Sequence, residues 1–91
     1  MQSKTEFEAA IGQTFQVALE DGSFAVKLTE VAGLARAERA GGGFSAVFEG
    51  PEGAHLEQGL YRLTGAGHEI DVFLVPIGPF GQGMGYEAVY T

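Results

Sequence analysis

With 91 residues, 45% of them hydrophobic, the chain is long enough for one folded domain and too apolar to be disordered. Five basic residues against twelve acidic ones give a formal net charge of −7, which argues against binding to nucleic acid or to anionic membrane surfaces. The chain has no cysteine, so disulfides and thiolate metal sites are excluded, and no stretch reaches the ~18 consecutive apolar residues of a membrane span.

The first predicted element is a short helix over residues 3–11, "SKTEFEAAI". A serine and a glutamate with capping-box spacing stand at its start, and Gly12 suits its end. Phe7 and Ile11 lie one helical turn apart and are predicted to share a face. Because an isolated helix of this length is only marginally stable, we expect it to cover an open end of a β-structure.

Residues 13–31, "QTFQVALEDGSFAVKLTEV", alternate between apolar and polar on both sides of an Asp-Gly pair. Asp21-Gly22 is a strong signal for a two-residue hairpin turn, which would fix the register of the two strands. One face of this hairpin carries glutamine, threonine and lysine and is predicted to face solvent. On the opposite face, the register from this turn places three apolar pairs: Leu19 with Phe24, Val17 with Val26, and Phe15 with Leu28.

The strand pattern breaks over residues 32–43, "AGLARAERAGGG", which are predicted to form a mobile loop. Alternation resumes over residues 44–50, "FSAVFEG", and Pro51 and Gly53 mark the turn that follows. The predicted inward face of this strand consists of Phe44, Ala46 and Phe48.

A second hairpin is predicted over residues 58–78, "QGLYRLTGAGHEIDVFLVPIG". A two-residue turn at Gly65-Ala66 would suit type II′, which takes glycine at its first central position. The resulting register pairs Tyr61 with Ile70 and Arg62 with Glu69.

The second strand of this hairpin is apolar on both sides from Val72 to Val75, so we expect it to be central and covered on both faces. Pro76 has no N–H to donate and is predicted to mark the end of pairing. The last strand is "YEAVYT", whose inward face is predicted to hold Tyr86, Ala88 and Tyr90.

About six short strands behind a single helix predict a mainly β fold, a small antiparallel barrel or sandwich with one short N-terminal helix. No repeat or linker divides the chain, so residues 1–91 are interpreted as one β-domain, with the helix at about 3–11 and strands from about 13 to 90.

The run "GQGMG" at residues 81–85 superficially resembles a nucleotide-binding loop. A dinucleotide fingerprint needs a helix after the glycines, but the few residues that follow Gly85 alternate like a strand. There is also no Lys-Ser or Lys-Thr pair, as a P-loop would require. We therefore interpret the run as a loop between two strands, in which Phe80 and Met84 either fold back on the core or contact another protein.

Residues able to carry chemistry are few. His55 and His68 are predicted to be solvated loop histidines, since nothing nearby has metal-ligand spacing. Glu69 and Asp71 share a strand face, which usually means a solvent face, and the three serines lack the context of a nucleophile. No catalytic, cofactor-binding or metal-binding residue is predicted, and the chain is not expected to be an enzyme.

Five motifs, "FEAAIGQTFQV", "FSAVFEGP", "LEQGLYRL", "DVFLVPIGP" and "GYEAVY", resemble a bacterial family of short domains of unknown function. The resemblance covers the chain from Phe7 to Tyr90 and implies a self-contained fold. Some members of that family are encoded near phage-tail-collar-like or tail-fibre-like proteins, which implies structural or assembly work. The family offers no catalytic residue to carry over to this chain.

Two functions are weighed. The first is a non-enzymatic protein–protein interaction or assembly module, an accessory of a phage-tail-like or fibre/collar protein, in the cytoplasm or in a particle assembled there. Its partner would be such a protein or a second copy of the chain. The last strand is expected to be a sheet edge to which a partner strand adds. The candidate contact residues are Phe80, Met84, Tyr86 and Tyr90.

The alternative is a small barrel that binds an apolar ligand in its interior. A barrel of about six strands is usually filled by its own side chains, so a packed interior would count against this function. The residues predicted to line the cavity are Phe15, Phe44, Phe48 and Tyr61.

Overall fold

The computed structural model describes residues 4–20, 22–33, 43–53 and 56–90. These residues form one short helix and six antiparallel strands, which confirms the predicted mainly β fold. The elements are α1 (Lys4–Ala9), β1 (Thr14–Leu19), β2 (Gly22–Gly33), β3 (Phe44–Gly50), β4 (Gly59–Gly65), β5 (His68–Phe80) and β6 (Gly83–Tyr90).

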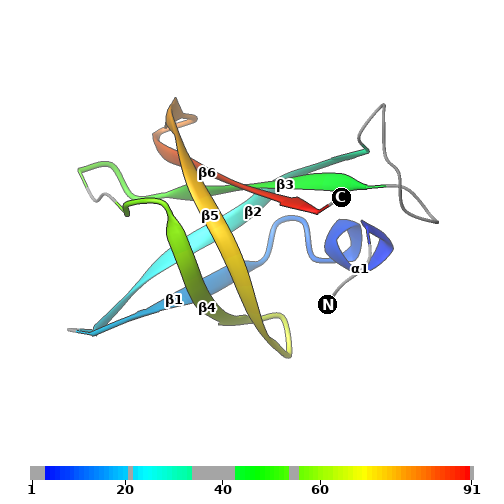
Figure 1. Ribbon diagram of the computed structural model, residues 1–91, viewed down its shortest axis with the longest axis horizontal. Coiled ribbons are helices and arrows are strands. Elements are labelled where there is room, and N and C mark those ends of the chain that lie inside the picture. Colours follow the sequence, from blue (N-terminus) through cyan, green and yellow to red (C-terminus); the bar gives the residue numbers. More distant parts are fainter. Residues whose placement is uncertain (1–3, 21, 34–42, 54–55, 91) are drawn as a thin grey trace.

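The strands close into a barrel in the order β1-β2-β3-β6-β5-β4 (Figure 1). Of the two predicted architectures, the barrel is therefore correct. Strand β6 lies between β3 and β5, so the expectation that the last strand forms a sheet edge was wrong. The sequence pattern could not reveal this, because alternation specifies which residues face inward and not which strands are neighbours.

The barrel closes where β1 meets β4, through the pairs Gln16–Thr64 and Val17–Leu63. Gly65 lies directly against β1 at this seam, and a Cβ atom there would come within 2.5 Å of the Thr14 carbonyl oxygen. The absence of a side chain at this position is thus what lets the two strands approach.

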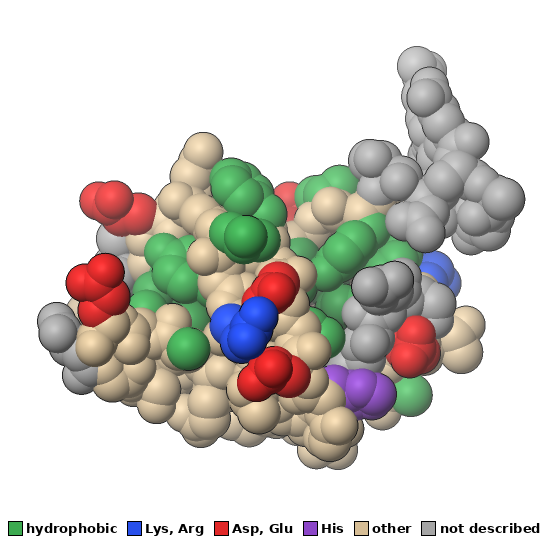
Figure 2. Space-filling view, turned by 60° about the horizontal axis from the view of Figure 1, so that its bottom comes forward, with side chains coloured by type: hydrophobic (Ala, Val, Ile, Leu, Met, Phe, Trp, Pro, Cys, Tyr) green, Lys and Arg blue, Asp and Glu red, His purple; other side chains and the backbone are tan. Residues whose placement is uncertain are grey.

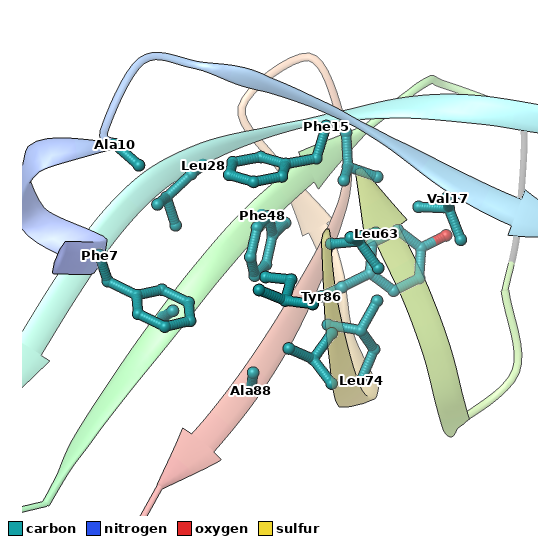
Figure 3. Packing of buried hydrophobic residues seen from close by; sticks show 14 of the residues in the cluster. Phe7, Ala10, Phe15, Val17, Leu28, Phe48, Leu63, Leu74, Tyr86 and Ala88 are labelled. Atoms are coloured by element: carbon teal, nitrogen blue, oxygen red, sulfur yellow. The ribbon is translucent and has the colours of Figure 1, made fainter. Parts of the chain in front are cut away.

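The barrel interior is filled by the inward-facing side chains of every strand together with Phe7 from α1 (Figure 3). The Phe15 and Phe48 rings meet edge to face, with centroids 5.9 Å apart. Burying a side chain of this size stabilises the fold by about 1.5–3 kcal/mol. The predicted inward faces of β3 and β6 are confirmed, since Phe44, Ala46, Phe48, Tyr86 and Ala88 are each no more than 2% exposed.

Helix α1 lies at one end of the barrel, beside the end of β6, as predicted (Figure 1). Phe7 is fully buried there, with its ring centroid 5.3 Å from Phe44 and 5.4 Å from Tyr90. The prediction that Ile11 shares this face was wrong: Ile11 is 44% exposed. The helix ends at Ala9, so Ile11 lies beyond it, in the turn before Gly12, and no longer shares a helical face with Phe7. The predicted capping serine lies outside the described residues.

The first hairpin is present, but its predicted register was wrong by two residues. Leu19 pairs with Gly22, and Val17 pairs with Phe24. A shift of two residues leaves every side chain on its predicted face. The observed register places Phe24 against the core, where its ring meets that of Tyr86 at 6.5 Å, and leaves the hairpin end exposed. Asp21 lies outside the described residues.

The second hairpin was also predicted two residues out of register. Gly65 pairs with His68, so Ala66 and Gly67 form the turn, with φ of +52° and +79°. Two successive positive φ values are those of a type I′ turn, whose twist matches that of the strands it joins. The predicted pairs of Tyr61 and Arg62 are replaced by Tyr61–Val72 and Arg62–Asp71.

Strand β2 runs to Gly33, past the predicted start of the loop, and the remainder of that loop, residues 34–42, lies outside the described residues. A β-bulge interrupts its pairing with β3 at Thr29, whose hydroxyl donates a hydrogen bond to the Val47 carbonyl oxygen at 3.1 Å. The extra residue reverses the alternation, so Glu30 faces outward and Val31 packs toward the core.

Two predictions for β5 were wrong. Pairing does not end at Pro76, which lies opposite Tyr86; the strand continues through a bulge to Phe80. Pairing of β5 with β4 ends earlier, at Leu74. Pro76, which has no N–H to donate, therefore lies next to the bulge, where a ladder hydrogen bond is not required of it. The strand is also not covered on both faces, because a small barrel has one interior, and Phe73 on the outer side is 51% exposed.

Replacing Tyr86 with phenylalanine should destabilise the domain by about 1–3 kcal/mol. The buried Leu56 N–H donates a hydrogen bond to the Tyr86 hydroxyl oxygen at 3.0 Å, and the variant would leave this donor without an acceptor. Urea unfolding of Tyr86→Phe measures the change. Tyr61→Phe is the matched control, because the Tyr61 hydroxyl bonds the Glu57 carbonyl oxygen at an exposed site where water can replace it. Equal losses in both variants would contradict this account.

Candidate functional site

Two of the four candidate contact residues lie in or against the core. Tyr86 is 0% exposed, so it has no surface to offer a partner and is left out of the contact surface argued below. Tyr90 is half-buried, and its ring stacks on Phe44 with centroids 4.9 Å apart. Burial raises the pKa of the Tyr90 hydroxyl above its usual range.

The other two candidates belong to a tight hairpin. Phe80 pairs with Gly83, so the connection between β5 and β6 consists of Gly81 and Gln82 alone. Phe80 is half-buried, and Met84 is half-buried and packs against the core. Both are therefore partly engaged within the fold, as one of the two interpretations of the sequence predicted.

The glycine-rich run is a strand connection only at Gly81 and Gln82, and its last three residues belong to β6, where a loop was predicted. Its surroundings are unsuited to phosphate. The Glu49 carboxylate accepts a hydrogen bond from the Gln82 N–H at 2.7 Å, so an anion already occupies a backbone donor at the tip. Glu52 lines the hollow of about 320 Å³ beside Met84. Two carboxylates would repel a phosphate group.

An exposed apolar pair lies on the outside of the barrel, across β4 and β5. Leu60 and Phe73 lie directly opposite each other on β4 and β5 and are 71% and 51% exposed. Further along β5, Val75 pairs with Glu87 on β6. We call the exposed pair of Leu60 and Phe73 the apolar stripe. Figure 2 shows hydrophobic side chains distributed around a basic side chain on one face.

Charged residues border the apolar stripe on both sides. On β4 and β5, Arg62 Nε donates a hydrogen bond to Asp71 Oδ1 at 2.9 Å, and Arg62 Nη1 lies 3.5 Å from Glu69 Oε1. The two acids therefore lie on an exposed face, as the sequence predicted. The hydrogen bond from Arg62 holds the pKa of the Asp71 carboxyl below its usual range. On the other side lies Glu87. Three carboxylates against one guanidinium leave this face with an excess of negative charge.

Sequence reasoning missed the apolar stripe, although a signal for it was present. Once Val72 and Leu74 are assigned to the interior, alternation requires that Phe73 face outward. The apolar run was instead interpreted as a strand covered on both faces. That interpretation suits a strand in a sandwiched parallel sheet and not one in a barrel.

The histidines and acids do not assemble a metal site in the described part of the chain. His68 is exposed at the start of β5, as predicted, and His55 lies outside the described residues. Among the residues that the structure describes, no group of three or more histidine, aspartate or glutamate side chains is placed to hold a metal ion.

The aromatic residues predicted to line a ligand cavity are packed instead. Phe15, Phe44 and Phe48 are each no more than 2% exposed and contact other core side chains (Figure 3). Tyr61 is only half-buried, and its hydroxyl donates a hydrogen bond to the Glu57 carbonyl oxygen at 2.6 Å. The packing of these rings counts against an apolar ligand inside the barrel.

Comparison with known proteins identifies a family and nothing beyond it. A family model described as a domain of unknown function (DUF6916) matches residues 3–90. No curated protein and no solved structure matches the chain. Within the described residues, no helix has the length and apolar character needed to cross a membrane.

Proposed function

The chain belongs to the DUF6916 family of domains of unknown function, and we propose that it is a non-enzymatic protein–protein interaction or assembly module that contacts its partner through the apolar stripe. The observation that carries this proposal is the cross-strand pair of Leu60 and Phe73, which are 71% and 51% exposed on the outside of a barrel whose interior is already filled.

Burial of the apolar stripe would contribute to the driving force for association. Covering a large aliphatic or aromatic side chain contributes about 1.5–3 kcal/mol, and aromatic residues often dominate interface energetics. Leu60 and Phe73 add little to the fold in their exposed positions. The rim of charged residues around them matches the usual arrangement of an interface, with an apolar centre and a polar border.

For the partner we propose a tail-collar-like or fibre-like protein, met in the cytoplasm or in a particle assembled there. The support is the resemblance of five sequence motifs to a family with members encoded near such proteins. The partner would bind the face of the barrel and not a free strand edge, because β6 is paired on both sides.

Site-directed photocrosslinking in the host cell tests this function. Phe73 is replaced by the photoreactive residue benzoylphenylalanine, and Ser23, exposed on β2, receives the same replacement as the matched control. We expect a discrete crosslinked protein, identified by mass spectrometry, from position 73 and none from position 23. Crosslinks that are the same at both positions, or no crosslink at position 73, would contradict the proposal.

A further inference from the structure

We propose that a groove beside the apolar stripe binds a lysine or arginine side chain of the partner segment that covers the stripe. This inference rests on the proposed function, because it names the chemistry of that partner. The groove has a volume of about 480 Å³ and lies over β2, β3 and β6. Its apolar lining includes Ile11, Val31 and Val47, and its polar lining includes Glu30, Ser45 and Glu87.

The two carboxylates lie on opposite sides of the groove. Val47 on β3 pairs with Glu30 on β2 and with Glu87 on β6, so the three residues form one row across the strands. Neighbouring strands are about 4.8 Å apart, which separates the two glutamate backbones by about 10 Å. The bulge at Thr29 is what turns Glu30 to the outside of the barrel. A cation entering the groove would thus have an acid on each side and an apolar floor beneath it.

Ser45 supplies an independent indication of a ligand. It is only 9% exposed, and its hydroxyl forms no hydrogen bond with any residue that the structure describes. Since every fully buried side-chain nitrogen or oxygen among the described residues has a partner, this hydroxyl must open onto the groove that it lines. A hydroxyl that opens onto the groove from a largely buried residue can accept a hydrogen bond from a donor bound there.

The groove's chemistry selects a long cationic side chain. The two carboxylates can only accept hydrogen bonds, and the serine hydroxyl can accept one as well. The methylene stem of lysine or arginine would cover Val47 and Ile11 while its charged head reaches the acids. A metal ion fits poorly, because no third histidine or acidic side chain among the described residues joins the two carboxylates to complete a coordination sphere.

The groove and the apolar stripe are parts of one continuous surface. Glu87, which lines the groove, pairs with Val75, and Phe73 lies two residues before Val75 on the same face of β5. Two residues along β5 and one strand spacing across it therefore separate the Phe73 and Glu87 backbones by ~8 Å, a distance that an extended segment spans in about three residues. The partner segment should carry an aromatic or aliphatic residue about three positions from a lysine or arginine.

A display library of short random peptides, selected on the purified domain, tests the inference. The wild type is compared with the double variant Glu30→Gln and Glu87→Gln. The control is Glu20→Gln with Glu57→Gln, which removes the same charge from exposed positions outside the groove. We expect wild type and control to enrich peptides with the apolar-to-basic spacing given above. A synthetic peptide from that selection should bind the groove variant at least about tenfold more weakly.

The other outcomes separate this inference from the proposed function. Enrichment of apolar peptides without a basic residue, or equal binding of the selected peptide to all three proteins, would overturn the groove while leaving the apolar stripe as a contact surface. Enrichment of basic peptides without an apolar neighbour would overturn the link between groove and stripe. Failure of the wild type to enrich any peptide would overturn the groove inference. The proposed function would then be tested by the crosslinking experiment at position 73 alone.

Discussion

Replacing Gly83 with alanine should destabilise the domain by about 3 kcal/mol or more, a large part of the ~5–15 kcal/mol that keeps a small domain folded. Gly83 opens β6 directly beside the end of β3, and a Cβ atom at this position would overlap the Gly50 carbonyl oxygen. It would also lie 3.2 Å from the Glu52 amide nitrogen. Both obstacles are backbone atoms, so relief requires one strand to move.

Thermal and urea unfolding measure this effect. A loss of this size corresponds to a fall in the melting temperature of more than about 10 °C for a domain of this length. Gly33→Ala is the matched control, because Gly33 also lies in a strand and its added Cβ would meet only the flexible Lys4 side chain, at 3.6 Å. The control should change the stability by less than about 0.5 kcal/mol. Similar unfolding of the two variants would show that β3 and β6 do not approach as closely as described.

The sequence was sufficient to predict most strands and their inward faces, because side-chain alternation is a local property. Phe44, Ala46 and Phe48 were assigned to the interior on that basis, and all three are buried. Register was harder to predict. In both hairpins the predicted turn was one residue from the observed one, which changes the register by two residues; a change of two preserves alternation, so the pattern could not expose the error.

What decided the registers were contacts between distant parts of the chain. Gly65 was predicted to be a turn residue on local grounds, but its position against Thr14 across the seam requires a residue without a side chain within the strand. The bulges at Thr29 and Ile77 likewise follow from barrel closure, which bends strands locally. No property of the residues around a bulge reports that requirement.

The candidate surface was only partly accessible to sequence reasoning for a related reason. Phe80 and Met84 attracted attention because apolar residues among glycines look exposed, yet they pack within a tight hairpin. Phe73 looked like a core residue because it lies within an apolar run, and Leu60 was assigned to neither face. Whether an apolar run is covered on one face or on both depends on the architecture, and the choice between barrel and sandwich had been left open.

Replacing Leu60 and Phe73 together with threonine should leave the fold intact and reduce recovery of the partner at least about 30-fold, since loss of a dominant contact pair costs about 2 kcal/mol or more. Threonine favours strands, so the backbone of β4 and β5 should be unaffected, and the two side chains lie mostly outside the core. Quantitative mass spectrometry of proteins captured from host lysate by the immobilised domain measures recovery, and urea unfolding checks the fold.

Leu19→Thr is the matched control for this variant. Leu19 is also an apolar strand residue, 40% exposed, but it lies at the end of β1 and not on the apolar stripe. If nonspecific hydrophobic adsorption caused the capture, Leu19→Thr would lower recovery in proportion to the apolar area lost. That decrease would be measurable but far smaller than about 30-fold. If the apolar stripe is the contact surface, Leu19→Thr should recover the partner as the wild type does. Full recovery by the double variant would mean that the partner binds a different face of the barrel.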